Sequence, residues 1–292
     1  MTYRTHCFMN WKTARRTISL ERPLVMAILN VTPDSFSDGG QYLSVDDALR
    51  QAEKMVTEGA DIIDIGGEST RPGSSGTTAG EEIRRTIPVI EAIRKRFDTP
   101  ISIDTTKSEV AERAMDAGAE IINDISGLRF DERIADIAAA SQAGLVLMHS
   151  RGAFETLHTQ PPVDDILAEV TLDFHRAIKT AKSRNVADEQ IVLDIGLGFG
   201  KTQDQNLELL AKLANIVDEF KAYPMLVGAS RKSFIGKLLG DVPPTERLGG
   251  SLAAAILAVR NGARMIRVHD VKETVAAVKA AIAIQENQRS SK

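Results

Sequence analysis

Residues 24–40, LVMAILNVTPDSFSDGG, decide how this chain folds. The stretch opens with a continuous apolar run, which is typical of a β-strand buried on both faces. The polar part that follows contains Pro33 and the pair Gly39 and Gly40, residues that favour turns over both helix and strand. It also carries one aromatic residue, Phe36, among hydroxyls and carboxylates, as binding loops on rigid scaffolds often do. The stretch predicts a buried strand and then a loop that either connects to a helix or binds a ligand.

The same kind of apolar run recurs along the chain. The runs fall at residues 24–29, 61–65, 100–104, 120–124, 145–149, 191–195, 224–228 and 264–268. The segments between them have the apolar spacing of helices, and residues 45–57 are one example, with an acidic pair at the start. The joins at 58–60, 117–119, 142–144 and 261–263 share a Gly and Ala ending, which is a helix C-cap signal. The chain therefore repeats a strand–helix unit.

Eight buried strands that alternate with helices predict an α/β fold, a single (β/α)8 TIM barrel. A doubly wound open sheet is the alternative, but no Gly-x-Gly-x-x-Gly fingerprint follows the first strand. A long loop of small residues at 66–80 is expected to be mobile, and two helices are expected after the seventh strand, at 230–240 and 245–261. We expect an N-terminal extension at 1–23, irregular or a short hairpin packed through Trp11 and Ile18. The barrel would span 24–286, with a disordered tail at 287–292.

Composition excludes several classes of protein. The chain has 292 residues, is 43% hydrophobic and has a net charge of −4, with no basic run of the kind that binds nucleic acid. No apolar run approaches the roughly 20 residues that span a bilayer, and the N-terminus lacks the apolar segment of a signal peptide. The only cysteine, Cys7, excludes an internal disulfide and fits a reducing compartment. We expect a soluble cytoplasmic protein with neither a nucleic-acid nor a membrane partner.

Polar residues follow nearly every predicted strand. In a barrel of this type the active site lies at the carboxyl ends of the strands. The residues there are Asn30, Glu68, Ser69, Thr70, Arg71, Asp104, Asn123, His149, Asp194, Lys232, Arg267 and His269. Each alone could cap a helix or hold a turn, but together they indicate a site.

One part of this set suits an anion. Arg267 and His269 alternate along a strand and so point to the same side, and barrel closure brings Asn30 beside them. An arginine offers a planar pair of donors to phosphate, and a histidine adds another. Asn30 offers a neutral oxygen to Mg²⁺, which binds mainly through substrate phosphates.

The other part suits a polar ring. Asp104, Asn123 and Asp194 would face the barrel interior, where a carboxylate needs a partner. A heteroaromatic ring with adjacent N–H donors, such as a 2-amino-4-oxo pyrimidine edge, would bind an aspartate through two hydrogen bonds, and Lys232 could hold the ring carbonyl or a neighbouring nitrogen. Internal Asp–Lys ion pairs remain an alternative for one of the two aspartates.

Two other features do not indicate sites. The stretch GLGFGKT at 196–202 resembles a P-loop, but the first glycine of that motif would fall on Ile195. His149, His158 and His175 have no metal-ligand spacing with cysteine or glutamate clusters, and we expect His158 and His175 to be surface or packing residues.

Eight motifs match one known family. They are ILNVTPDSFSDGG at 28–40, DIGGESTRPG at 64–73, IDTTKSEV at 103–110, INDISG at 122–127, LMH at 147–149, LDIGLGFGK at 193–201, GASRKSFIG at 228–236 and RVHDV at 267–271. On these motifs the chain resembles the dihydropteroate synthases, the folate-pathway members of the pterin-binding barrel family. The resemblance implies a transferase that condenses 6-hydroxymethyl-7,8-dihydropterin diphosphate with p-aminobenzoate, uses Mg²⁺ and forms a homodimer. The Ala-rich helices at 251–259 and 275–284 could supply the dimer contact.

The resemblance also implies residue roles. The pterin-binding residues would be Asp104, Asn123, Met148, Asp194 and Lys232. The diphosphate and metal site would comprise Asn30, Arg267 and His269, with Asn30 as the Mg²⁺ ligand and with Thr70 and Arg71 reaching the same substrate. The aminobenzoate pocket would be lined by Phe36, Pro72, Phe199 and the stem of Lys232, with Asp38 ordering the closed loop and Ser233 binding the carboxylate. The catalytic set is then Asn30, Lys232, Arg267 and His269.

Two alternatives come from the same resemblance. A pterin-dependent methyltransferase would share the Asp and Asn positions but is not expected to carry both ESTRPG at 68–73 and SRKSFIG at 230–236. A non-catalytic pterin-binding paralogue would lack a site residue, and none is missing. The chain departs from the family at Ile195, where proline is usual, and in the segment HSRGAFETLHTQPP at 149–162.

Overall fold

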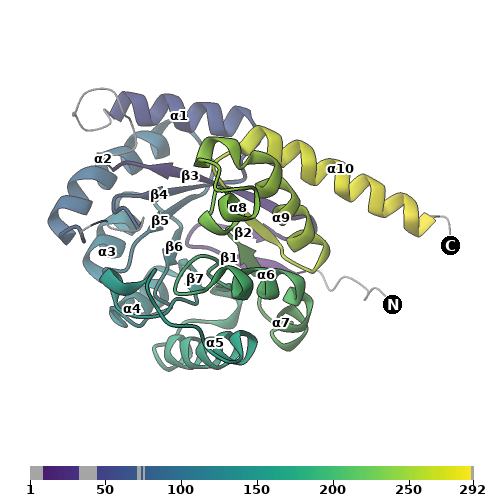
Figure 1. The fold of residues 1–292 in the computed structure, drawn as a ribbon. Helices are drawn as coiled ribbons and strands as arrows, with labels where there is room; N and C mark the ends of the chain where they lie inside the picture. The colour runs from purple at the N-terminus through teal and green to yellow at the C-terminus, as the bar shows by residue number, and fades with distance from the viewer. Residues whose placement is uncertain (1–8, 33–44, 71–73, 75, 291–292) are drawn as a thin grey trace.

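Eight parallel strands close into a barrel in the computed structural model, which describes residues 9–32, 45–70, 74 and 76–290. The order around the barrel is β10, β3, β4, β5, β6, β7, β8 and β9, and β9 pairs with β10. The strands are β3 (Leu24–Asn30), β4 (Ile62–Gly66), β5 (Ile101–Asp104), β6 (Ile121–Asp124), β7 (Gly144–Met148), β8 (Ile191–Asp194), β9 (Met225–Val227) and β10 (Met265–Val268). Helices surround the strands (Figure 1). The predicted TIM barrel is confirmed.

The helices connect successive strands along the outside of the barrel. They are α1 (Val45–Thr57), α2 (Ala79–Arg96), α3 (Ser108–Asp116), α4 (Arg133–Ser141), α5 (Ile166–Ser183), α6 (Gln203–Ala211), α7 (Leu213–Glu219), α8 (Ser233–Leu238), α9 (Leu248–Arg260) and α10 (Val271–Ser290). Two helices follow β9, as expected, but two also follow β8, which the apolar spacing did not predict. The helix α10 continues to Ser290, into the segment expected to be a tail, because no proline or glycine interrupts it.

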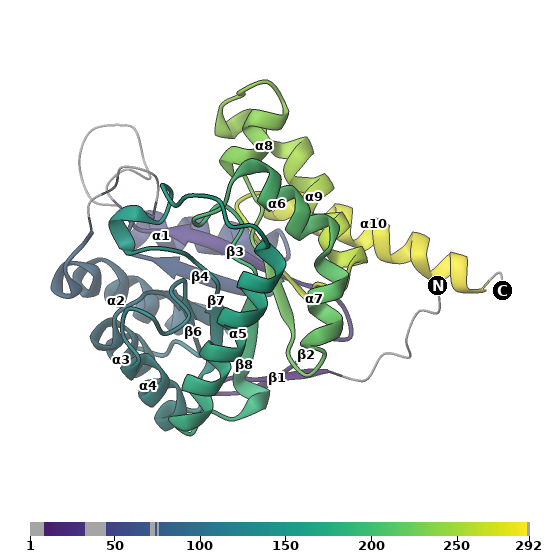
Figure 2. The ribbon, with the colours of Figure 1, turned by 60° about the horizontal axis from the view of Figure 1, so that its bottom comes forward.

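A two-stranded hairpin precedes the barrel. It consists of β1 (Asn10–Lys12) and β2 (Thr17–Ser19) (Figure 2). Within it, Trp11 lies opposite Ile18. The Trp11 ring is fully buried, and its indole N–H donates to the Gln190 carbonyl oxygen at 2.8 Å. A side chain at Gly144 would lie 2.8 Å from this ring, so the glycine makes room for it. The predicted hairpin therefore covers the amino ends of the strands.

The four helix-to-strand joins are less alike than their sequences suggest. Three place a glycine in the left-handed region, namely Gly59, Gly118 and Gly262, with φ between 96° and 106°. The fourth places Gln142 there, with φ of 55°, while Gly144 is already the first residue of β7. The glycine in the fourth motif thus serves packing rather than the helix cap.

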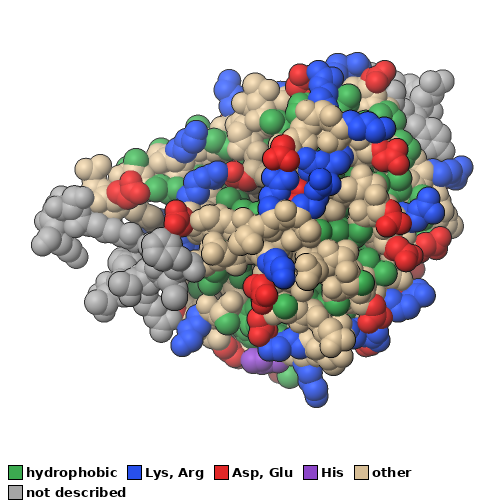
Figure 3. Space-filling view, turned by 180° about the vertical axis from the view of Figure 1, so that it is seen from behind, with side chains coloured by type: hydrophobic (Ala, Val, Ile, Leu, Met, Phe, Trp, Pro, Cys, Tyr) green, Lys and Arg blue, Asp and Glu red, His purple; other side chains and the backbone are tan. Residues whose placement is uncertain are grey.

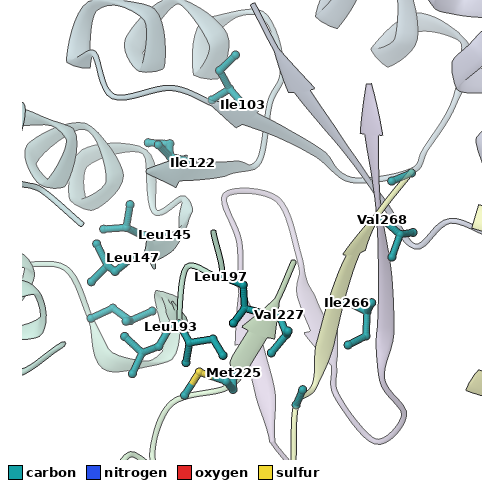
Figure 4. Packing of buried hydrophobic residues seen from close by; sticks show 14 of the residues in the cluster. Ile103, Ile122, Leu145, Leu147, Leu193, Leu197, Met225, Val227, Ile266 and Val268 are labelled. Atoms are coloured by element: carbon teal, nitrogen blue, oxygen red, sulfur yellow. The ribbon is translucent and has the colours of Figure 1, made fainter. Parts of the chain in front are cut away.

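Side chains alternate strictly along the barrel strands. Those that face outward, such as Leu147, Leu193 and Val227, pack against the helices (Figure 4). Those that face inward near the amino ends form an apolar layer with Trp11, comprising Met26, Ile62, Ile121, Val146, Val192, Leu226 and Met265. Because this layer fills the lower half of the barrel, polar inward-facing residues are confined to the carboxyl end.

Charged side chains of both signs lie on the face of the molecule opposite to that seen in Figure 1. Basic and acidic side chains are interspersed over the face shown in Figure 3. Across the described residues, no helix has both the length and the apolar content to cross a membrane.

Candidate active site

The polar residues expected at the strand ends meet inside the carboxyl end of the barrel. Along each strand, these residues lie at least two positions beyond the apolar layer. They face the same side as that layer because side chains alternate along a strand. The predicted residues there are Asn30 on β3, Asp104 on β5, Asn123 on β6, Asp194 on β8 and Arg267 on β10, and they are joined by Met148 on β7 and by Asp64 on β4, which was not predicted. His149 was predicted to belong to the set, but it is buried on the outer side of β7, near the cations Lys201, Arg129 and Arg151. Burial lowers its pKa, and those charges act in the same direction.

Arg267 lies at the centre of this set. Its Nε donates to Asp64 Oδ2 and its Nη2 to Asp104 Oδ2, each at 2.6 Å. Burial lowers the pKa of Arg267, but the two carboxylates outweigh that effect and raise it. Arg267 and Asp104 were predicted to lie in separate parts of the site, whereas in the structure they share one hydrogen-bond network. Internal ion pairs, the alternative considered for one of the aspartates, are present in the structure. Their cation is Arg267 and not Lys232.

Asp64 is a site residue that was not predicted. It is fully buried, and its Oδ2 also accepts a hydrogen bond from Asn123 Nδ2 at 3.1 Å, while its Oδ1 has no partner. It therefore connects Arg267 to the neighbouring strand. Asp64 precedes the end of β4 by two residues, whereas the predicted site residues lie at the strand ends or just beyond them. The sequence feature that could have identified it is a carboxylate in the middle of the apolar strand segment IIDIG at 62–66.

Asp104 has an unusual acidity. Burial raises its pKa to about 7, Arg267 opposes the shift, and the nearby Asp64 adds to it. The carboxyl group therefore exchanges a proton near neutral pH. Asp194 is also buried, and burial raises its pKa, while its Oδ1 accepts a hydrogen bond from the Gly196 N–H at 2.8 Å.

His269 is held in its neutral form. Burial lowers its pKa to about 3, and the charges of Arg267 and Arg231 act in the same direction. Ser230 Oγ accepts a hydrogen bond from the His269 backbone N–H at 3.2 Å and lies 3.1 Å from Nδ1. Because the Ser230 oxygen already accepts the backbone N–H, its hydroxyl proton is free to be donated to Nδ1 of His269. The proton of the neutral ring then lies on Nε2. Ser230 was quoted in a motif, but its positioning of His269 was not predicted.

The glycine-rich turn after β8 folds around its own lysine. Lys201 Nζ donates to the carbonyl oxygens of Gly196 at 2.7 Å, Phe199 at 3.2 Å and His149 at 3.3 Å. Gly196 has a φ of 61°, and a side chain there would lie 1.9 Å from the His149 carbonyl oxygen. Burial lowers the pKa of Lys201 to about 7. The lysine thus stabilises the turn and is not directed at a phosphate.

Lys232 and Phe199 form the wall beside Asp194. The Lys232 ammonium lies 4.1 Å from the centroid of the Phe199 ring, a cation–π contact. Burial lowers the pKa of Lys232 to about 8, and Arg267 contributes to the shift. Phe199 packs against Met148, and Ser233 opens α8 with an exposed side chain.

The loop between β4 and α2 is anchored by buried ion pairs. Lys107 Nζ donates to Glu68 and Glu82 at 2.8 Å each, and Glu68 also accepts the Thr77 N–H at 2.5 Å. The Thr70 carbonyl oxygen lies 2.7 Å from His158 Nε2, so His158, expected to be a surface or packing residue, contacts this loop. The predicted site residues Phe36, Asp38, Arg71 and Pro72 lie outside the described residues.

Asn30 and Asp104 are oxygen-bearing side chains that could contribute to a cation site. Across the described part of the chain, no three His, Cys, Asp or Glu side chains are grouped as metal ligands. Asn30, Gly66 and Asp104 are neighbours across three strands, and a side chain at Gly66 would lie 3.5 Å from Asn30 Oδ1 and 3.8 Å from Asp104 Oδ2. The glycine thus leaves room between two oxygen ligands. Such a site fits Mg²⁺ that is already bound to phosphate.

The fold and the site together define a barrel enzyme that binds a polar heteroaromatic ring next to an anion. The sequence model of the family described as pterin binding enzyme matches residues 26–269. The dihydropteroate synthase of Escherichia coli (strain K12) is 49% identical over 280 residues, which cover 94% of this chain and 96% of the relative.

Solved structures agree with this match. A Xanthomonas albilineans dihydropteroate synthase with 4-aminobenzoic acid has a TM-score of 0.89 and 42% identity, and the match covers 95% of this chain and 98% of that one. A Burkholderia cenocepacia dihydropteroate synthase complexed with 7,8-dihydropteroate has a TM-score of 0.87 and 40% identity, covering 98% and 100%. The chain belongs to the dihydropteroate synthase family of pterin-binding enzymes.

Proposed function

We propose that this protein condenses 6-hydroxymethyl-7,8-dihydropterin diphosphate with p-aminobenzoate to give 7,8-dihydropteroate and diphosphate. The observation that carries the proposal is the group of Asp104, Asn123 and Asp194 around Arg267 at the carboxyl end of the barrel, in which Asn123 and Asp194 are buried and Asp104 is partly buried. The methyltransferase and the non-catalytic paralogue considered above lack a comparable observation in their favour.

The pterin ring would lie in the inner half of the site. A carboxylate there can accept hydrogen bonds from adjacent ring N–H groups, and Asp194 has one oxygen already fixed by Gly196. Lys232 would donate to the ring carbonyl or a ring nitrogen, because its ammonium is held beside this space by Phe199. Met148, which is buried and faces the interior, would pack on the ring. The pocket thus matches donors on one ring edge and acceptors on the other.

The diphosphate would lie above the ring, at the mouth of the barrel. Arg267 and the Nε2–H of His269 would donate to its oxygens, and Asn30 and Thr70 would lie beside it. Mg²⁺ bound with the diphosphate, with Asn30 as its protein ligand, would add positive charge to the leaving oxygens. Since Asp64 and Asp104 fix the guanidinium before substrate arrives, little reorganisation is needed when negative charge develops.

The reaction needs no covalent intermediate with the enzyme. The bond between the pterin methylene carbon and the diphosphate oxygen breaks, and its electron pair leaves with the diphosphate. The positive charge that remains on the methylene is delocalised into the pterin ring. The lone pair of the neutral aminobenzoate nitrogen then forms the new C–N bond, and the nitrogen loses a proton. The protein contributes positioning and charge stabilisation.

The aminobenzoate would lie against Phe199 and the stem of Lys232, with its carboxylate near Ser233. Phe36, Asp38 and Pro72, which were predicted for the same pocket, lie outside the described residues. We also propose a homodimer through α9 and α10, where Leu257 and Ile284 expose apolar side chains, and a cytoplasmic location.

Diphosphate release tests the proposed function. We expect release to require both pterin diphosphate and p-aminobenzoate, and to be accompanied by equimolar 7,8-dihydropteroate. Release that proceeds without p-aminobenzoate, or no release with both substrates present, would contradict the proposal. Chelation of Mg²⁺ by EDTA should abolish release, and added Mg²⁺ should restore it.

A further inference from the structure

Lys201 holds together the segments that follow two neighbouring strands. Its Nζ donates to the carbonyl oxygens of Gly196 and Phe199 in the turn between β8 and α6, at 2.7 Å and 3.2 Å. It also donates at 3.3 Å to the carbonyl oxygen of His149, the residue directly after β7. An ammonium group has three N–H donors, and these three carbonyl oxygens match them in number. The lysine therefore acts on the site through the backbone.

The turn that Lys201 holds is rich in glycine. Gly196 and Gly198 have φ angles of 61° and 83°, a region that glycine enters freely, so the sequence alone leaves this segment many conformations. Besides Lys201, the side chain of Asn206 accepts the Gly198 N–H at 2.7 Å. The single conformation of the turn thus depends on side chains that bind its backbone.

The turn in its bound form orients Asp194. The Gly196 N–H donates to Asp194 Oδ1 at 2.8 Å, while the Gly196 carbonyl oxygen accepts from Lys201. The His149 N–H donates to the Asp194 carbonyl oxygen at 2.9 Å, while the His149 carbonyl oxygen accepts from the same lysine. Both residues that hold Asp194 are therefore themselves held by Lys201.

The same turn places an aromatic wall. Phe199, whose carbonyl oxygen accepts from Lys201, packs in a buried cluster with Met148. Its ring also lies 4.1 Å from the Lys232 ammonium, measured to the ring centroid. The residues proposed to contact the pterin ring, namely Met148, Asp194 and Lys232, are thus each one contact away from a residue that Lys201 binds.

We propose that Lys201 is a positioning residue for the pterin ring, an inference that rests on the proposed function. It fixes the turn between β8 and α6, so that Asp194 and Phe199 are in place before the substrate binds. The groups proposed for the diphosphate, Arg267 and His269, lie on β10 and directly after it and are held by hydrogen bonds of their own. Loss of Lys201 therefore weakens binding of the ring and leaves binding of diphosphate intact.

The experiment compares Lys201→Met with the wild type by calorimetry at pH 6.5, where the ammonium predominates because the pKa of Lys201 is about 7. Two ligands are measured in the presence of Mg²⁺, pterin diphosphate and inorganic diphosphate. We expect the Kd for pterin diphosphate to rise about 10- to 100-fold, the effect of losing a charge-assisted hydrogen bond, and the Kd for inorganic diphosphate to stay within about twofold. Lys201→Gln, which keeps two N–H donors on a shorter side chain, should give a smaller rise, and it takes the place of Lys201→Met if that variant does not fold.

A matched control is Lys182→Met, which removes an exposed lysine of α5 that pairs with Asp188. Both of its dissociation constants should equal those of the wild type. A folded Lys201 variant that binds pterin diphosphate with wild-type affinity, even with a lower unfolding temperature, would overturn the inference, and so would an equal loss of affinity for both ligands. Failure of the proposed function gives a different result, because the wild type itself would then form no product that depends on both substrates.

Discussion

Asp104 connects the geometry of the site to its expected pH dependence. Its partly buried side chain contacts Arg267, and its pKa is about 7 instead of the usual value near 4. A ring that offers N–H donors binds the carboxylate and not the protonated acid. Because the pKa is raised, the binding form is depleted as pH falls below about 7.

We therefore expect affinity for pterin diphosphate to weaken below about pH 7, approaching tenfold per unit at the acid end. Calorimetry between pH 5.5 and 8.5 measures this, with inorganic diphosphate as the control for ionisation of the phosphates. Asp104→Asn should bind pterin diphosphate weakly at every pH. Wild-type affinity that parallels that of inorganic diphosphate, or undiminished binding by Asp104→Asn, would refute the assignment.

Residue types at the strand ends could be predicted from the sequence, but their pairing could not. Alternation and barrel closure place Arg267 and Asn30 on one face of neighbouring strands, which spacing reveals. The bond from Arg267 to Asp64 spans 203 positions in the chain and depends on side-chain conformation. Likewise, the protonation states of Asp104 and His269 follow from burial, which a sequence does not specify.

At the scale of elements, the β4–α2 loop depends on one lysine. Lys107 pairs with Glu68 and with Glu82, whose side chain is fully buried. Burial raises the pKa of Glu82, and the charge of Lys107 opposes that shift. Removal of the lysine leaves a buried carboxylate without its cation.

We expect Lys107→Met to lower the free energy of unfolding at pH 7 by about 3–5 kcal/mol, the range for removal of one partner of a buried ion pair. Urea denaturation monitored by circular dichroism measures it. The control is Lys212→Met, which removes a lysine from an exposed pair with Glu208 and should change stability little. Equal stability of the two variants would show that the buried pair does not hold the loop.

Most element boundaries followed from local signals, and the exceptions have physical reasons. The strand at 24–29 and the helix at 45–57 were predicted closely because their patterns are long and unmixed. Gly144 was predicted to end a helix as the other three glycines do. It instead makes room for Trp11, a contact between segments that are distant in the sequence. The second helix after β8 lacked a signal, since no proline or glycine separates α6 from α7.

The whole molecule is a barrel with one apolar end and one polar end. Trp11 and the inward-facing layer fill the amino end, and β10 closes onto β3, so that the last strand of the barrel pairs with the first. Arg267 can therefore contact residues of β4 and β5 across the interior. Chemistry is restricted to one mouth of the barrel, where pterin, diphosphate and aminobenzoate would meet.

The central claim is that this mouth condenses the two substrates by stabilising the departing diphosphate through Arg267. The most direct measurement is the rate of diphosphate release by Arg267→Ala with both substrates saturating. We expect turnover to fall by about 10²–10³-fold, with thermal unfolding verifying the fold. Arg22→Ala, which removes an arginine paired with Asp61 at the amino end of the barrel, should keep the wild-type rate. A folded Arg267→Ala protein with a nearly unchanged rate would contradict the account.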